Sequence, residues 1–124
     1  MNKLIPIGGL AVLAIALFFL FNPSGGPGQY DGFAQCLTEK GVKMYGAYWC
    51  SHCKNQKELF GSSFQYVQYI ECDVNGQQSP ACTQAGVTGY PTWIFSDGNK
   101  VAGELSFEKL SAYSGCSLTH NATK

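Results

Sequence analysis

Two cysteines separated by two residues are the part of this sequence best suited to carry out chemistry. They are Cys50 and Cys53 in the stretch Tyr-Trp-Cys-Ser-His-Cys, with His52 between them. A thiol pair at this spacing can close a redox-active disulfide, form a structural bridge or supply half of a zinc site. Zinc would need a second pair or spaced histidines, and the other cysteines and His120 fit that pattern poorly. Redox chemistry is therefore the favoured interpretation, and no metal is expected.

The pair falls where a predicted buried strand, residues 42–49, meets a predicted helix, residues 50–61. A thiol at a helix N-terminus faces unpaired N–H groups and the positive end of the helix dipole, and both stabilise a thiolate. His52 can add positive charge beside Cys50. These features predict Cys50 as an exposed attacking thiol and Cys53, one turn further on, as a buried resolving thiol.

Helical and strand-like patterns alternate along the rest of the chain. Helices are expected over residues 30–41, 50–61, 79–86 and 106–115, and strands over residues 42–49, 64–73, 92–95 and 100–103. Asp31 is the predicted N-cap of the first helix. This order predicts an α/β fold, a three-layer α/β/α sandwich around a small mixed sheet.

The first 29 residues differ in composition from the rest of the chain. Residues 4–21 carry no charged or strongly polar side chain, and residues 22–29 are rich in Pro, Gly and Ser. An apolar stretch of this length can just span a bilayer as a helix. The sequence therefore predicts a transmembrane anchor within residues 1–21 and a flexible linker over residues 22–29, with a cleaved secretory signal as the alternative.

Both interpretations place the following domain outside the cytoplasm. That domain is expected over residues 30–116, with a C-terminal tail over residues 117–124. In the periplasm or a lumen, or outside the cell if the first segment is cleaved, disulfides persist, which agrees with six cysteines in 124 residues. All eight basic residues are lysines, balanced by eight acidic ones, so neither a basic cluster nor arginine suggests a nucleic-acid partner.

Two stretches, YGAYWCSHCKNQKELFG and GVTGYPTWIF, give the chain a family resemblance. It resembles thioredoxin-fold proteins, and more narrowly the thioredoxin-like domain fused to, or partnering, bacterial and plant homologues of vitamin K epoxide reductase. The resemblance covers roughly residues 33–113. It implies a four-stranded mixed sheet, the attacking and resolving roles given above, and Pro91 as a cis-proline facing the thiols. The backbone of Tyr90 would pair with an extended substrate segment, and Trp49 is expected to lie partly over the site.

The resemblance also bears on the other cysteines. Cys72 and Cys82 resemble an inserted pair of the epoxide-reductase-linked domains, so a structural or auxiliary disulfide is expected between them. Cys36 and Cys116 are left as candidates for a second disulfide, although the sequence alone also allows other pairings or two free thiols. Where many thioredoxins bury an acidic residue, six positions before the first active-site cysteine, this chain has Met44. The proton of the resolving thiol would then go to water or to His52.

The sequence thus predicts a membrane-tethered, extracytoplasmic thiol–disulfide oxidoreductase. Its only cofactor would be its own redox-active disulfide, Cys50–Cys53. The expected partners are protein thiols and disulfides, together with a quinone-linked membrane thiol oxidase of the vitamin K epoxide reductase type, which the resemblance implies. Two alternatives remain open: a dedicated disulfide reductant of an exported protein, and a soft-metal chaperone that uses both cysteines and His52.

Overall fold

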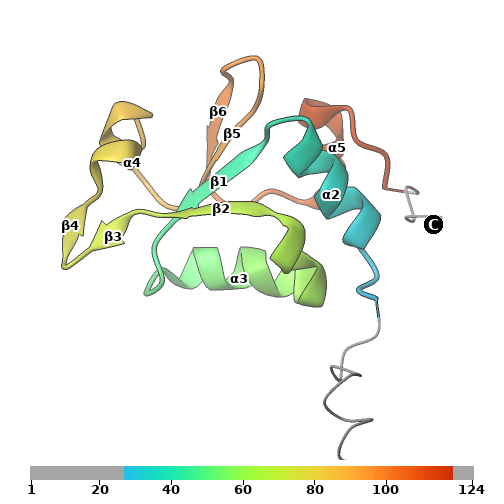
Figure 1. The fold of residues 1–124 in the computed structure, drawn as a ribbon, viewed down its shortest axis with the longest axis horizontal. Helices are drawn as coiled ribbons and strands as arrows, with labels where there is room; N and C mark the ends of the chain where they lie inside the picture. Colours follow the sequence, from blue (N-terminus) through green and yellow to red (C-terminus); the bar gives the residue numbers. More distant parts are fainter. Residues whose placement is uncertain (1–26, 119–124) are drawn as a thin grey trace, which may run out of the picture.

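A four-stranded mixed sheet forms the centre of the computed structural model, which describes residues 27–118 (Figure 1). Strand β1 pairs in parallel with β2 and antiparallel with β5, and β5 pairs antiparallel with β6, in the order β2-β1-β5-β6. The bounds are β1 Lys43–Gly46, β2 Gln68–Glu71, β5 Thr92–Ile94 and β6 Lys100–Ala102. The expected α/β fold with a four-stranded mixed sheet is confirmed.

Helices connect and cover these strands (Figure 1). Within residues 27–118 their bounds are α2 Asp31–Glu39, α3 Ser51–Phe60, the 3-10 helix η1 Gly61–Tyr66, α4 Pro80–Gln84 and α5 Phe107–Ser114. The N-terminal ends of α4 and α5 have ordinary serine caps, because Ser79 and Ser106 accept hydrogen bonds from the amides of the third helical residues. Gly115, with a φ of 78°, ends α5 in the left-handed conformation that glycine adopts most readily.

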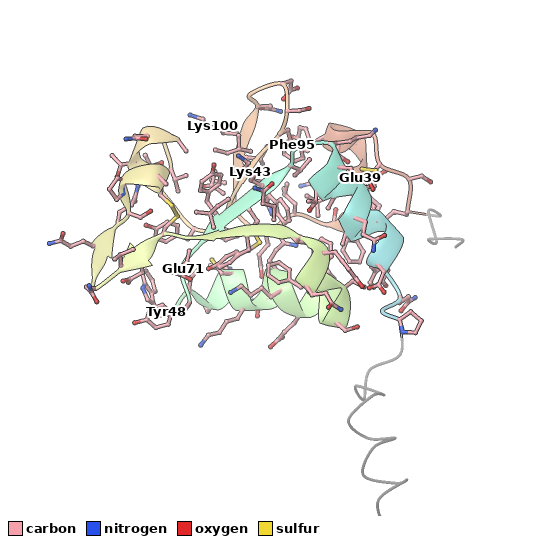
Figure 2. All side chains as sticks on the ribbon, in the orientation of Figure 1. Glu39, Lys43, Tyr48, Glu71, Phe95 and Lys100 are labelled. Atoms are coloured by element: carbon pink, nitrogen blue, oxygen red, sulfur yellow. A yellow bond between two sulfur atoms is a disulfide. The ribbon has the colours of Figure 1, made fainter. Side chains whose placement is uncertain are left out.

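Two apolar clusters lie on opposite faces of β1, because successive side chains of a strand point to opposite sides. Met44 belongs to the larger cluster, which α2, α3, β5 and α5 share. Tyr45 belongs to the smaller cluster, where it meets Cys72, Cys82 and Val87 beside α4. Side chains thus pack on both faces of the sheet (Figure 2).

Two local predictions were wrong, one at the start of α2 and one at the start of β2. Tyr30, not Asp31, is the N-cap residue of α2, and it makes no side-chain capping bond. The Asp31 carboxylate instead accepts hydrogen bonds from the Gly28 amide and the Ser63 hydroxyl, both at 2.8 Å. The strand expected over residues 64–73 begins only at Gln68, since the residues before it continue α3 as η1. The bond from Asp31 to Ser63 of η1 is a tertiary contact, which local capping patterns do not report.

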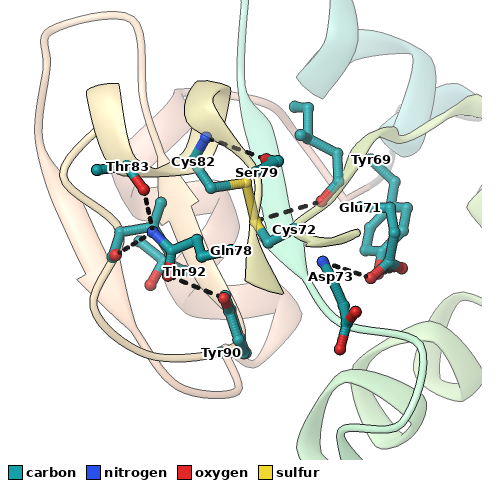
Figure 3. The surroundings of a disulfide bond; sticks show 12 residues. Tyr69, Glu71, Cys72, Asp73, Gln78, Ser79, Cys82, Thr83, Tyr90 and Thr92 are labelled. Carbon is teal, nitrogen blue, oxygen red and sulfur yellow. Dashed lines mark hydrogen bonds between the residues drawn. A yellow bond between two sulfur atoms is a disulfide. The ribbon is translucent and has the colours of Figure 1, made fainter. Parts of the chain in front are cut away.

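The segment after β2 forms an unpredicted two-stranded ribbon, β3 Asp73–Val74 with β4 Gln77–Gln78, before α4. A disulfide between Cys72 and Cys82 joins the start of this ribbon to α4 (Figure 3). We call residues 72–87 the insert. It packs at the end of the sheet where β1 leads into α3 (Figure 1).

The Gln56 side chain, which is buried, fastens α3 to the rest of the core. Its amide nitrogen donates to the Leu105 carbonyl at 3.0 Å, and its oxygen accepts from the Leu105 amide at 2.7 Å and the Trp93 indole at 3.1 Å. Every polar atom of this side chain is therefore used, as buried polar groups require. Gln56 lies one turn beyond Cys53, so it holds the helix that carries both thiols.

Within the part of the chain that the structure describes, no helix has the length and apolar character needed to cross a membrane. The predicted anchor over residues 1–21 lies outside that part.

Replacing Gln56 by Leu should destabilise the protein although the side-chain volume is nearly kept. The substitution leaves the Trp93 indole N–H and both Leu105 backbone groups buried without partners, which should cost about 3 kcal/mol or more in total. Gln65→Leu is the control, because the Gln65 side chain is exposed and bonds only to the Ser62 carbonyl. Urea denaturation measures both variants, and equal stabilities would contradict the structural role of Gln56.

Candidate active site

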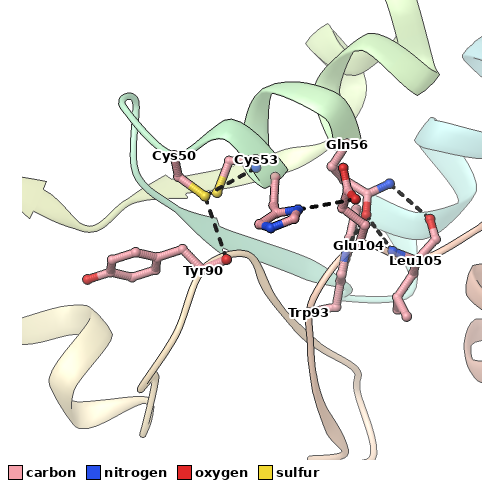
Figure 4. Close-up of polar contacts among 8 residues, drawn as sticks. Cys50, Cys53, Gln56, Tyr90, Trp93, Glu104 and Leu105 are labelled. Carbon is pink, nitrogen blue, oxygen red and sulfur yellow. Dashed lines mark hydrogen bonds and ion pairs between the residues drawn. The ribbon is translucent and has the colours of Figure 1, made fainter.

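The sulfur of Cys50 stands at the N-terminus of α3 and serves as the cap of that helix. It accepts a hydrogen bond from the Cys53 amide at 3.2 Å, and its thiol donates to the Tyr90 carbonyl at 3.6 Å (Figure 4). The Tyr90–Pro91 peptide bond is cis, and it lies on the loop that faces the two cysteines. Both cysteines are free thiols in the structure. The first turn of α3 and the loop before β5 therefore meet at one sulfur atom.

Both thiols are largely covered, and to different extents. Cys50 retains 7% of its surface accessible, and Cys53 retains none. The expectation of an exposed Cys50 was therefore wrong, because its sulfur turns toward the helix amide and the Tyr90 carbonyl rather than outward. The two cysteines still differ in accessibility, because only Cys50 has surface exposed to solvent. Trp49 is 55% exposed, and its ring meets that of Tyr90 edge-on with the centroids 6.0 Å apart.

The buried thiol resists ionisation. Burial, followed by the hydrogen bond with Cys50, raises the pKa of Cys53 to about 12, and the backbone hydrogen bond at Ala47 and the charge of Lys57 oppose this only in part. A thiol with such a pKa is protonated throughout the neutral range, and only the thiolate attacks a disulfide. Any reaction of Cys53 near neutral pH therefore needs a path for its proton.

Alkylation of the reduced protein should show this difference directly. Near neutral pH, iodoacetamide should modify Cys50 roughly ten times faster than Cys53 or more, because Cys53 is both covered and protonated. The pKa of Cys53 is raised, so its thiolate fraction, and with it its labelling rate, should keep growing with pH until about 12. Mass spectrometry of peptides from timed quenches measures both rates. Equal labelling of the two cysteines, or a Cys53 rate that levels off below pH 9, would contradict the assignment.

His52 takes a different position from the one expected. Its imidazole is 68% exposed, and Nδ1 lies 3.4 Å from Oε2 of Glu104, on the loop that follows β6. The side chain thus links α3 to that loop, and its partner is a carboxylate rather than a thiol. Sequence analysis missed Glu104, because the loop that carries it is 52 residues away from His52.

The insert holds both aromatic residues beside the thiols. The Trp49 indole donates a hydrogen bond to the Asp73 carboxylate. The Tyr90 hydroxyl donates to Oε1 of Gln78 at 2.9 Å (Figure 3). The Gln78 amide in turn donates to the Val87 carbonyl at 2.9 Å. The expected substrate-contacting residues, Trp49 and Tyr90, therefore depend on side chains of the insert for their positions. Motif reasoning had singled out neither Asp73 nor Gln78.

The structure pairs the four remaining cysteines as Cys72–Cys82 and Cys36–Cys116. The first disulfide lies inside the insert, whereas the second joins α2 to the segment after α5 across 80 residues of sequence. In residues 27–118 no group of three or more His, Cys, Asp or Glu side chains is arranged to hold a metal ion.

Removing each disulfide should have a different effect on catalysis. Cys72→Ala with Cys82→Ala should cost about 2–3 kcal/mol of stability by the loop-closure relation and raise KM for a peptide disulfide, because Asp73 and Gln78 lose their fixed position. Cys36→Ala with Cys116→Ala is the matched control, and it should cost more stability, about 4–5 kcal/mol, but leave KM unchanged. Denaturation and steady-state kinetics on the folded variants measure both effects. An equal change of KM in the two double variants would refute the role of the insert.

A buried and a partly accessible thiol at a helix N-terminus, opposite a cis-proline loop on an α/β fold, define the class of thiol–disulfide exchange proteins. The family model for thioredoxin matches residues 29–113. The chain therefore belongs to the thioredoxin family.

Two plant proteins are among its relatives. Thiol-disulfide oxidoreductase LTO1 of Arabidopsis thaliana is 41% identical over 91 residues, which cover 68% of this chain and 24% of that protein. Protein disulfide isomerase-like 2-2 of Oryza sativa subsp. japonica is 30% identical over 138 aligned positions. The alignment covers 90% of this chain and 35% of that protein. The chain thus spans between about a quarter and about a third of these relatives. Among solved structures, Fasciola hepatica thioredoxin is 25% identical with a TM-score of 0.42, covering 66% of this chain and 91% of that one.

Proposed function

We propose that this chain is a thiol–disulfide oxidoreductase that works on the extracytoplasmic side of a membrane, to which its first segment tethers it. In this proposal it passes electrons from exported protein thiols to a quinone-linked membrane thiol oxidase of the vitamin K epoxide reductase type. The apolar run over residues 4–21 and the linker after it support the tether. The motif context of the two active-site cysteines supports the partner, and two structural disulfides agree with an oxidising compartment.

The position of Cys50 is the observation that carries the chemical part of the proposal. The sulfur of Cys50 caps α3, and of the two cysteines only Cys50 has accessible surface. The Cys50 sulfur is therefore the atom that reacts with a partner. When the Cys50–Cys53 disulfide is open, the Cys50 thiolate attacks a partner disulfide and releases one partner thiol. Cys53 then attacks Cys50 in the mixed disulfide, which closes the pair and frees the second partner thiol. The same steps in reverse oxidise a substrate dithiol.

The tether makes a membrane partner favourable. A domain on a short linker stays near the bilayer surface, and this confinement raises its effective concentration toward an integral membrane protein. A dedicated reductant of one exported protein would use the same two thiols in the opposite net direction. The identity of the protein held in the mixed disulfide separates the two functions.

Trapping that mixed disulfide tests the proposal. Cys53→Ala removes the thiol that would release the partner, so full-length Cys53→Ala expressed in its own host should accumulate covalent complexes at Cys50. Cys50→Ala is the matched control, and it should trap little because Cys53 is covered and protonated. Acid quenching, purification from the membrane fraction and mass spectrometry then identify the bound proteins.

A membrane thiol oxidase with an exposed cysteine pair is the expected partner, at several times its amount in the Cys50→Ala control. Recovery of soluble exported proteins only, with nothing from the membrane, would reject the relay. A single dominant exported protein would then favour the dedicated reductant.

A further inference from the structure

Cys53 must lose a proton before it can attack the mixed disulfide, and the face of β1 that packs against α3 offers no group to take it. Met44 occupies the position on β1 where many thioredoxins have an acid, and its side chain is fully buried among apolar neighbours. His52, the other candidate from the sequence, faces Glu104. The acceptor for this proton therefore has to come from another element.

The neighbouring strand places two polar side chains on the required face. The parallel register aligns Met44 with Tyr69 and Gly46 with Glu71. Tyr69 and Glu71 are two residues apart, so both project toward the same side of the sheet. That side faces α3, because the amino group of Lys57 on α3 lies 4.0 Å from the centre of the Tyr69 ring.

Gly46 leaves a gap between the Cys53 thiol and the Tyr69 hydroxyl. A Cβ atom at this position would lie 2.9 Å from Sγ of Cys53, 3.0 Å from Cε2 of Tyr69 and 3.3 Å from the Tyr69 hydroxyl. The residue is glycine for reasons of space, since any side chain would collide with both groups. The thiol and the hydroxyl therefore both border the space above the Gly46 backbone, where one bridging water molecule can carry a proton between them.

A carboxylate lies directly behind the hydroxyl. The Tyr69 hydroxyl donates to Oε2 of Glu71 at 2.7 Å. Oε1 of Glu71 accepts from the amides of Tyr48 at 3.2 Å and Asp73 at 3.0 Å, which fixes the carboxylate beside the active-site loop (Figure 2). Glu71 is only partly buried, so it can exchange protons with the solvent.

We infer that Glu71 accepts the proton of Cys53 through the hydroxyl of Tyr69. As the Cys53 sulfur attacks Cys50, its proton passes through a bridging water molecule to the Tyr69 oxygen while the hydroxyl proton passes to Glu71. The Cys50–Cys53 bond forms, the bond from Cys50 to the partner sulfur breaks, and the partner leaves as a thiolate that solvent protonates. Cys53 is oxidised and the partner sulfur is reduced, so that electrons and protons balance.

The surrounding charges suit a relay of this kind. Burial, with the hydrogen bond to Glu71, raises the pKa of Tyr69, so the hydroxyl stays protonated and passes a proton on rather than holding a charge. Lys57 favours negative charge on Cys53. Four groups from other elements surround the path. They are Cys50 at the start of α3, Lys57 within α3, Asp73 on β3 and Tyr90 on the loop before β5.

The pH dependence of resolution tests the path without any natural partner. One equivalent of Ellman's reagent converts Cys50 of the reduced full-length protein to a mixed disulfide with thionitrobenzoate, and attack by Cys53 releases the coloured thiolate. Stopped-flow absorbance gives this rate between about pH 5 and pH 10, the range below the ordinary pKa of tyrosine. The wild-type rate should change little through the neutral range. Tyr69→Phe and Glu71→Gln should each lower it about 100-fold at neutral pH.

In both variants the rate of thionitrobenzoate release should rise in proportion to the hydroxide concentration. At alkaline pH it should approach the wild-type rate. Glu71→Gln keeps an oxygen for the Tyr48 and Asp73 amides, and Tyr69→Phe keeps the ring beneath Lys57, so the fold should survive. The matched controls are Tyr66→Phe and Glu58→Gln, two exposed positions that should retain the wild-type profile.

Wild-type rates at neutral pH in either Tyr69→Phe or Glu71→Gln would overturn the inference. An equal fractional loss at every pH would also overturn it, because that is the result of a purely structural role. If one variant does not fold, the profile of the other decides. The outcome is independent of the membrane partner, since no protein substrate enters the assay.

Discussion

The hydrogen bond from the Cys53 amide to the Cys50 sulfur joins the fold to the chemistry. At an ordinary helix start a serine, threonine or aspartate oxygen would accept from this amide, and here a thiol sulfur does so at 3.2 Å. The same bond therefore caps α3, places Cys50 within reach of Cys53, and directs unpaired N–H groups toward a sulfur that becomes negative in the reaction. The loop with the cis Tyr90–Pro91 bond completes the site by placing a carbonyl against the same sulfur.

That hydrogen bond has its effect only if α3 is held rigidly against the sheet. Gln56 provides this hold, because its amide satisfies groups of Trp93 and Leu105 that would otherwise be buried without partners. Aromatic packing adds to it, with Phe60 of α3 meeting Phe107 and Trp93 at centroid distances of 4.9 Å and 6.2 Å. The depth to which the helix is packed is also the reason that Cys53 is covered and its pKa raised. Structural rigidity and the need for a proton path thus have one cause.

The two disulfides outside the active site differ in what they position. Cys36–Cys116 joins α2 to the segment after α5. Cys72–Cys82 fixes a short insert whose polar side chains hold Trp49 and Tyr90. A small domain with short strands has few apolar contacts at the edge of its sheet, and a covalent bridge there keeps the contact surface around Cys50 in one shape.

The sequence by itself determined the elements and the chemistry that depend on neighbours along the chain. The spacing of Cys50 and Cys53 and the alternating elements led to the α/β fold, a small mixed sheet and the thiol–disulfide class, because each follows from local patterns. The family resemblance added the four strands of that sheet. Tertiary structure alone decided the contacts between distant segments. The burial of Cys50, the turn of His52 toward Glu104 and the hold of Gln78 on Tyr90 depend on which elements pack together. The placement of Tyr69 and Glu71 behind Cys53 follows from the β1–β2 register, which the residues of either strand do not encode alone.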